Sequence, residues 1–344
     1  MWSFGSMALA YSGILLDGVF TWGLMIYAFV LVPVVELIIS GSKENSSFEK
    51  EKEKLNDPVF DILIYLIVPL QYLLLFLFCV NIQRELELYE LIGKVFTFGL
   101  ACGVYGINVA HELGHRVKKY EQVMAKSLLL TSQYMHFFIE HNRGHHNKVS
   151  TYEDPASSRF GEPIYAFWVR SVYGCYISAW KLESFRLKKA QIRFLSLRNE
   201  MLIYQFVQVT LLLLIFIVFN WQTMLMYLSS AVIGFLLLET VNYIEHYGLQ
   251  RHKGEQSFHK VLPVHSWNSN HPIGRGILFE LSRHSDHHFR ANRKYQILKH
   301  HEDAPQMPTG YPGMMVLALV PPLWFKVMNP EVEKLKREYS TTLA

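Results

Sequence analysis

Four short stretches of the sequence are rich in histidine, and their spacing suits metal binding. They read HELGHR at 111–116, EHNRGHH at 140–146, NYIEHYG at 242–248 and SRHSDHH at 282–288. In the first, His111 and His115 are four positions apart, so on a helix their side chains share one face, about 5–6 Å apart at Cβ. Two imidazoles at this spacing can bind one metal ion. Taken alone, HELGH also fits the HExxH pattern of zinc proteases.

Two of the other stretches add adjacent histidine pairs. They supply six residues: His141, His145 and His146, then His284, His287 and His288. Neighbouring residues on a helix point about 100° apart, so one member of each pair can serve one metal ion and the other a second ion. A zinc hydrolase rarely needs more than three protein ligands. The pattern therefore predicts a site for two metal ions.

His246 is the ninth candidate ligand, and it ends an apolar stretch. Asn242 and Glu239 precede it by four and seven positions, so all three share a helix face. A carboxylate near the end of a membrane span is costly unless it has a partner, which makes Glu239 a functional candidate. The alternative is that Glu239 is a capping or interfacial residue.

Metal-bound histidines usually donate their outer ring nitrogen to a carboxylate or amide. The candidates for that role stand beside the ligands: Glu112, Glu140, Asp154, Glu239, Asn242, Glu245 and Asp286. The remaining histidines occur singly or in polar loops, and we expect them at the surface or beside the ligands: His136, His252, His259, His265, His271, His300 and His301.

The apolar residues come in blocks that predict membrane helices. The sequence is 51% hydrophobic, and five blocks nearly free of charge lie at 19–40, 62–80, 91–110, 201–219 and 223–244. Each approaches the about 20 residues that a helix needs to cross hydrocarbon. Residues 2–17 are apolar but short and predict a tilted or shortened first span. Buried helices of a large soluble protein are the alternative.

These blocks predict an all-α integral membrane protein, a bundle of six transmembrane helices with a cytoplasmic His-rich cap. We expect four segments: 1–115 with transmembrane helices 1 to 4, 116–199 with the second His stretch, 200–248 with helices 5 and 6, and 249–344 with the last His stretch. Lys and Arg concentrate in 40–58, 116–199 and 247–344, which predicts that this side is cytoplasmic. The apolar patch near 313–328 is broken by prolines, so we expect it to dock at the interface.

Composition also excludes some classes of site. The three cysteines form no CxxC pair, so metal chemistry must rest on the 16 histidines, and a net charge of +4 gives no reason to expect nucleic acid. The N-terminus lacks the basic region of a signal peptide, so we treat it as mature structure. Imidazole-rich sites suit iron, copper or zinc. At the mouth of an apolar bundle, the chemistry that fits hydrocarbon substrates is redox activation of dioxygen.

The sequence resembles a known family, the bacterial membrane alkane 1-monooxygenases, within the membrane fatty-acid hydroxylases and desaturases. HELGHR, EHNRGHH, NYIEHYGL and LSRHSDHH are similar to the His boxes of that family, and EDPASSRFGE at 153–162, HSWNS at 265–269 and PPLWFKVM at 321–328 extend the match. The NYIEHYG box distinguishes the chain from ordinary desaturases. At Ser282 the family more often has Gln.

The resemblance implies a non-haem centre of two Fe ions held by the nine histidines, at the cytoplasmic face of a bacterial inner membrane. It implies that O2 and electrons from rubredoxin, itself reduced by an NADH-dependent rubredoxin reductase, convert medium-chain alkanes to 1-alkanols. Without CxxC pairs, the rubredoxin must be a separate protein. Basic residues would steer this acidic partner, for instance Lys118, Lys119, Lys188, Lys189 and Arg290, or they set topology and contact anionic membrane lipid. Phe29 and Phe96 are candidates for the floor of the substrate channel.

Three other functions stay open on the sequence. The same fold would serve a hydroxylase or desaturase of acyl chains or alkyl aromatics. HELGH alone would serve an intramembrane zinc protease with one zinc. A His-rich metal transporter or store would carry metal without consuming dioxygen.

Overall fold

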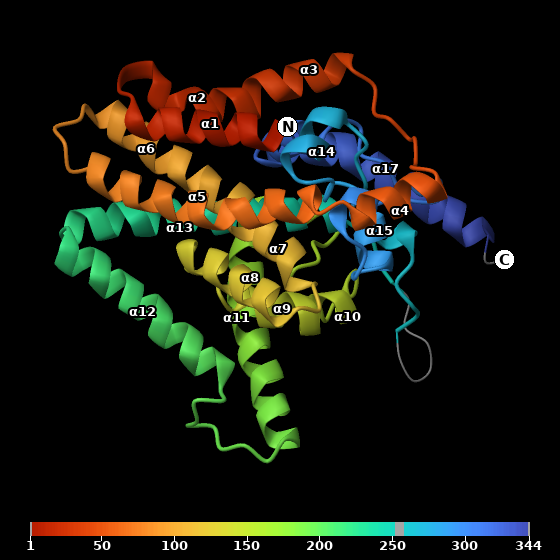
Figure 1. The fold of residues 1–344 in the computed structure, drawn as a ribbon. Helices are drawn as coiled ribbons and strands as arrows, with labels where there is room; N and C mark the ends of the chain where they lie inside the picture. Colours follow the sequence, from red (N-terminus) through yellow and green to blue (C-terminus); the bar gives the residue numbers. More distant parts are fainter. Residues whose placement is uncertain (1, 252–257, 343–344) are drawn as a thin grey trace.

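The computed structural model describes residues 2–251 and 258–342, and these residues are almost entirely helical (Figure 1). The only pairing of extended backbone in these ranges is an isolated bridge between Asn268 and Gln306. Five helices are long and apolar enough to cross a membrane: Gly18–Ile38, Val59–Asn81, Leu88–Gly114, Glu200–Val218 and Trp221–His246. The five long apolar blocks of the sequence thus form the five long helices.

The first of these long helices is built from four short pieces. They are η1 (Gly18–Trp22), α2 (Gly23–Ile26), η2 (Tyr27–Leu31) and α3 (Val32–Ile38). The piece η2 is a π-helical turn that ends two residues before Pro33. Proline has no N–H to donate to the preceding turn, and a π turn is one way in which a helix absorbs that loss.

The helix α1 (Trp2–Leu15) has only 14 residues and does not count among the five, so a sixth full span is not confirmed. It is nevertheless held at both ends. The Ser3 hydroxyl donates to the carbonyl of Gly276, while the buried Lys94 donates from Nζ to the carbonyls of Ile14 (2.6 Å) and Leu16 (2.8 Å). Lys94 thereby satisfies carbonyls that the end of α1 leaves free.

Two long helices lie against each other and deliver His111 and His246 to the same end. One consists of α6 (Leu88–Ala101), η3 (Cys102–Ile107) and α7 (Asn108–Gly114), and the other is α13 (Trp221–His246). Glycines allow the backbones to approach closely: a Cβ on Gly234 would lie 2.6 Å from Cβ of Cys102. Small residues at helix crossings are the usual way to pack membrane helices tightly.

The remaining helices complete the bundle and form a cap at the histidine-bearing end (Figure 1). They are α4 (Phe48–Asn56), α5 (Val59–Asn81), α8 (Lys119–Thr131), α9 (Phe137–Glu140), η4 (His141–His145), α10 (His146–Lys148), α11 (Ile164–Lys189), α12 (Glu200–Val218), η5 (Pro263–His265), α14 (Pro272–Ile277), α15 (His284–Phe289), η6 (Tyr295–Ile297), α16 (Tyr311–Ala318) and α17 (Pro321–Thr342). Neither α16 nor α17 is among the candidate spans.

Candidate metal centre

The nine histidines singled out in the sequence come together from four parts of the fold. They lie at the ends of α7 and α13, along η4 and α10, and on α15. Their ring nitrogens form two groups, in each of which one atom per residue lies within 4.8 Å of all the others. The five-histidine group contains His111, His115, His141, His146 and His287, and the four-histidine group contains His145, His246, His284 and His288.

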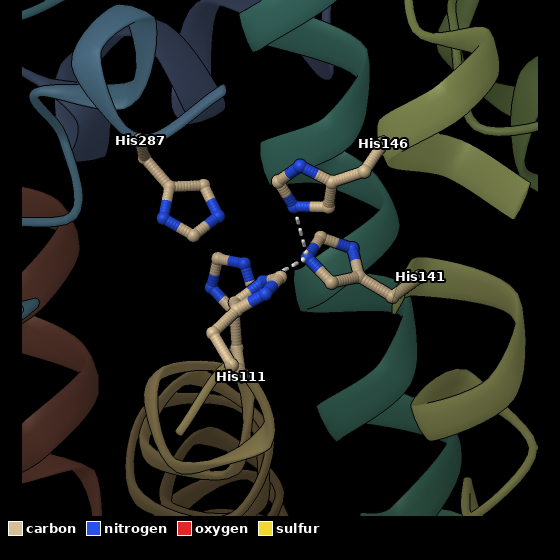
Figure 2. A group of neighbouring side chains, drawn as sticks. His111, His141, His146 and His287 are labelled. Atoms are coloured by element: carbon tan, nitrogen blue, oxygen red, sulfur yellow. Dashed lines mark hydrogen bonds between the residues drawn. The ribbon is translucent and has the colours of Figure 1, made fainter. Parts of the chain in front are cut away.

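In the five-histidine group the rings face a shared space (Figure 2). Nε2 of His141 lies 3.0 Å from Nε2 of His115 and 3.0 Å from Nε2 of His146. The ring of His111 lies 4.2 Å from that of His141 and 4.3 Å from that of His287, centroid to centroid.

The four-histidine group is equally compact. Nε2 of His145 and Nε2 of His288 are 3.2 Å apart. The ring of His246 lies 4.9 Å from that of His145 and 5.2 Å from that of His284. His246 and His145 belong to helices far apart in sequence, so this group ties α13 to the segment after α9.

Local helix geometry explains how the histidines divide. His284 and His288 are four positions apart on α15 and share a group, while His287 faces the other group. The second stretch differs, because His141 pairs with His146 rather than with His145. The reason is that residues 141–145 form the π-helical turn η4, in which backbone bonds connect positions five apart.

The buried nitrogens of these rings fit a metal centre. Among the residues that the structure describes, Nε2 of His111, both nitrogens of His246 and both nitrogens of His287 are buried without a hydrogen-bond partner. A buried polar atom without a partner is costly, and ordinary folded structure avoids it. A metal ion would supply the missing partner for one nitrogen of each ring, the one that carries the lone pair of the neutral imidazole.

The protonation states also suit metal ligands. Burial, reinforced for most by neighbouring histidines, holds the pKa well below its usual range for His141, His146, His284, His287 and His288. For His115, burial and the nearby His145 lower the pKa to about 3. These imidazoles are therefore neutral near pH 7, and a neutral imidazole has a lone pair for a metal ion.

Asp154 supports His145 directly. One carboxylate oxygen lies 2.8 Å from Nδ1 of His145 and accepts a 2.5 Å hydrogen bond from the Ser157 hydroxyl. Burial alone would lower the pKa of His145, but the charge and hydrogen bond of Asp154, together with the charges of Glu140 and Glu239, outweigh it and raise that pKa. This is the carboxylate–histidine arrangement that usually orients a metal ligand.

Other acidic residues near the centre have different partners. Glu112 accepts from Nε of Arg116 (2.9 Å) and from the backbone N–H of Tyr295. Asp286 accepts from Arg293 and His301, so it ties together the chain after α15. Neither carboxylate contacts an imidazole of the two groups through a hydrogen bond in the described structure.

The two acidic residues of α13 have polar neighbours. Glu239 accepts from Tyr134 (2.9 Å), Ser171 (2.5 Å) and Asn242 (3.2 Å). Glu245 has one oxygen 3.0 Å from Nε2 of His284, at an angle unsuited to a hydrogen bond.

Glu140 accepts from Ser178, 3.2 Å away. Burial, together with the charge of Asp154, raises the pKa of Glu140 to about 8.

An apolar cavity runs from the bundle to the centre. Its wall includes Leu24, Phe29, Leu100, Val104, Leu237, Leu238, Val241, Ile277, Leu278, Leu281 and Met315, and it reaches His111, His141 and His284. Leu100 and His111 are eleven positions apart along one helix, which is roughly 16 Å. The cavity is therefore long and narrow, with apolar walls and the histidines at one end.

Of the two phenylalanines expected at the channel floor, Phe29 lines this cavity. Phe96 does not, because its ring stacks on Trp22 with 6.0 Å between centroids. Helical periodicity alone did not reveal which face of the helix would meet the cavity. Leu24 and Leu100, which line it, carried no signal in the sequence beyond their hydrophobicity.

The other predicted residues lie outside the centre. Lys118, Lys119, Lys188, Lys189 and Arg290 are all exposed. Lys188 and Lys189 end α11, at its tip away from α15 (Figure 1).

Among the further histidines, His136 is buried but belongs to neither group, and His300 is also buried. His259 is exposed, and His265, His271 and His301 are partly exposed, while His252 lies outside the described residues.

Known proteins match most of the chain. The fatty acid desaturase family matches residues 91–318. An alkane 1-monooxygenase of Acinetobacter baylyi is 36% identical over 91% of this chain and 77% of its own length. Alkane 1-monooxygenase 1 of Pseudomonas aeruginosa is 44% identical over 70% of this chain and 63% of its own length. The hydroxylase component of a xylene/toluene monooxygenase of Pseudomonas putida is 28% identical over 82% of this chain and 76% of its own length.

The matched region contains all nine histidines of the two groups, and three of the five long apolar helices overlap it. For two relatives above 30% identity, the match with this chain also covers more than two thirds of the relative's own length. The chain therefore belongs to the alkane 1-monooxygenases of the fatty acid desaturase family and is a multi-pass membrane oxidoreductase.

Proposed function

We propose that this chain hydroxylates the terminal methyl group of medium-chain n-alkanes, using O2 and two electrons from a separate rubredoxin. The observation that carries this proposal is the apolar cavity that ends at His111, His141 and His284. A substrate that dissolves in the membrane and has no polar group needs such a cavity, because only burial of apolar surface can hold it there.

The proposed cofactor is a pair of iron ions, one in each histidine group. The five-histidine group and the four-histidine group each converge on one space, and several of their buried nitrogens lack other partners. Two iron ions would supply the activation of dioxygen. The protein residues hold these ions, keep most of the imidazoles neutral, and present one end of the substrate to them in a dry cavity.

We also propose six membrane segments with the cap in the cytoplasm. The short helix α1 would be the sixth, since Ser3 contacts the cap-side helix α14 while Ile14 and Leu16 contact Lys94 at the opposite end. Lys and Arg gather in the segments at the histidine-bearing end, which supports a cytoplasmic cap by the positive-inside rule. The four segments expected from the sequence keep their boundaries in this proposal.

For the electron carrier, the proposed docking surface is the exposed basic face nearest the histidines. Lys118 and Lys119 follow the first histidine stretch, and Arg290 follows the last one. Lys188 and Lys189 lie at the far tip of α11, so we assign them a smaller part. Charges of this kind raise the association rate of an acidic partner and lose their effect at high salt.

The alternative with specific support is a hydroxylase of alkyl aromatics, since one relative is the hydroxylase component of a xylene/toluene monooxygenase. A zinc protease built on HELGH has less support, because the Glu112 carboxylate is paired with Arg116 and does not face the centre as a general base would.

The test of the proposed function uses membranes that contain this chain, together with rubredoxin, its reductase and NADH. Octane, xylene and an acyl substrate are supplied separately, and metal is measured on the purified chain. We expect 1-octanol as the main product and two irons per chain. Preferred turnover of xylene or of the acyl substrate would move the assignment to that class, and one zinc with no consumption of O2 would overturn it.

A further inference from the structure

A second cleft lies apart from the two histidine groups, since none of the nine histidines lines it. It lies between α4, α14 and the first turns of α1 and α5, which are neighbours in Figure 1. Four cationic residues line it: Lys50, Lys54, Arg275 and Arg283. The carboxylates that line it are Glu44 and Glu280. The cleft is therefore electropositive.

Arg283 is the central cation of this cleft, and it is buried with only 3% of its surface exposed. Its terminal nitrogens donate to the backbone carbonyls of Leu298 (2.8 Å) and Glu44 (2.8 Å) and, more weakly, Ser42 (3.3 Å). Its Nε is buried without a partner. Within residues 2–251 and 258–342, no ion pair joins Arg283 to a carboxylate, so a buried charge lacks its usual compensation.

The other cations leave room for an anion. Arg275 is paired with Glu280, 2.6 Å apart, so these two charges compensate each other. Lys54 donates to the Ser46 hydroxyl (2.9 Å), and Lys50 is exposed, with neither joined to a carboxylate in the described structure. Lys50, Lys54 and Arg283 thus face the cleft against the single unpaired carboxylate of Glu44.

Part of the lining of this cleft is apolar. It is formed by Phe4 on α1, Phe60 and Leu63 on α5, and Phe279 after α14. Phe60 and Leu63 lie in the first turns of the candidate span Val59–Asn81, where a membrane helix begins. Cations at the end of a span with an apolar wall inside it match a phospholipid, which has an anionic headgroup above an acyl chain.

We propose that this cleft binds one anionic phospholipid of the adjoining leaflet. Its phosphodiester accepts from Nε of Arg283 and from Lys50 and Lys54, and one acyl chain follows Phe4, Phe60 and Leu63. A free phosphate would compensate the charge equally well but would leave the apolar wall uncovered. The proposal depends on the membrane position of α5 and not on the reaction at the metal centre.

Bound lipid would connect the membrane to the cap. Arg283 directly precedes His284, and its guanidinium holds the chain after α3 through Ser42 and Glu44. An anion at Nε would therefore fix the start of α15 against the bundle.

The test uses the purified full chain in detergent, titrated with dioctanoyl phosphatidylglycerol. Bound lipid is counted by native mass spectrometry, and the unfolding midpoint is followed in parallel. We expect one tightly held phosphatidylglycerol, a midpoint raised by several degrees, and weaker binding of zwitterionic dioctanoyl phosphatidylcholine. The double variant Lys50→Gln with Lys54→Gln should weaken binding of phosphatidylglycerol by about tenfold, because two cations near the headgroup are lost.

The matched control is Lys43→Gln with Lys52→Gln, which removes the same charge from the same segment outside the cleft. It should bind phosphatidylglycerol within about twofold of the unchanged chain. Equal weakening in both double variants would mean unspecific attraction and overturn the site. Equal binding of phosphatidylcholine would overturn recognition of the anion, and the same midpoint shift with inorganic phosphate alone would overturn the assignment to a lipid.

Discussion

His141 and His146 hold their Nε2 atoms 3.0 Å apart, although five positions separate them in the sequence. On an α-helix, residues five apart point about 140° away from each other. The π-helical turn over His141–His145 brings them to one side and turns His145 toward the other group. One short stretch therefore contributes to both histidine groups.

The first prediction concerns how metal is shared between the groups. His141→Ala removes a histidine from the five-histidine group, and His145→Ala removes one from the four-histidine group. We expect each variant to insert into the membrane, to lose hydroxylation, and to retain about one iron per chain, because the other group stays intact. Iron per chain by elemental analysis, with activity measured on the same sample, tests this.

His136→Ala is the matched control, since His136 is buried but outside both groups. It should keep both irons. Full activity in His141→Ala or His145→Ala would remove that residue from the ligand set. Loss of both irons in each variant would mean that the two positions fill cooperatively rather than independently.

The second prediction concerns Asp154. The change Asp154→Asn keeps the shape of the side chain but removes the charge that holds Nδ1 of His145. Losing such a partner typically costs about 10–100-fold in metal affinity. We expect iron in the four-histidine group to be lost to a chelator at correspondingly lower concentration, while iron in the other group is retained.

Asp57→Asn provides the same chemical change at an exposed position at the end of α4. Iron bound to the Asp57→Asn variant should resist the chelator to the same extent as iron bound to the unchanged chain. If Asp154→Asn and Asp57→Asn release iron alike, the carboxylate does not support the metal site.

The sequence was sufficient to predict which histidines come together and where the long helices lie, because both depend on local patterns. His111 with His115, and His284 with His288, follow the four-residue spacing of a helix and do share a group. The division of His141 from His145 was not predictable from spacing, because a π turn replaces the α-helical one there. The five long apolar blocks were visible because each is long enough to cross hydrocarbon.

The cavity and the second cleft depend on contacts between distant parts of the chain. Phe29 and Phe96 both stand in long apolar blocks of the sequence, but of the two only Phe29 lines the cavity. Glu112 looks like a general base within HELGH until its pairing with Arg116 is known. Arg283 stands next to a histidine in the sequence, and nothing in that pattern indicates that its Nε is buried without a partner.

The third prediction concerns substrate length. Leu100 lines the cavity roughly 16 Å from His111 along the helix, so Leu100→Phe should shorten the space. We expect the product profile to shift toward shorter alkanes, with activity on the shortest substrates preserved. Phe29→Ala should act in the opposite direction by widening the cavity. The measurement is gas chromatography of alcohols formed from a mixed alkane series.

Phe96→Ala serves as the comparison, because Phe96 is a large aromatic outside the cavity. It should leave the product profile unchanged. A profile that stays constant in both Leu100→Phe and Phe29→Ala would show that the substrate does not occupy this cavity.

The last prediction concerns the helix crossing that positions His111 and His246. A Cβ on Gly234 would lie 2.6 Å from Cβ of Cys102 and 3.1 Å from the carbonyl oxygen of Gly99, so Gly234→Ala must push α13 away from α6 and η3. Overpacking of this kind costs about 1–3 kcal/mol. The two helices carry ligands of different groups, so we expect a lower unfolding midpoint together with loss of iron. Gly5→Ala on α1, where nothing lies within 4 Å of the added carbon, should change neither quantity adversely. An unfolding midpoint and iron content in Gly234→Ala equal to those of Gly5→Ala would mean that the close crossing does not hold the two halves of the centre together.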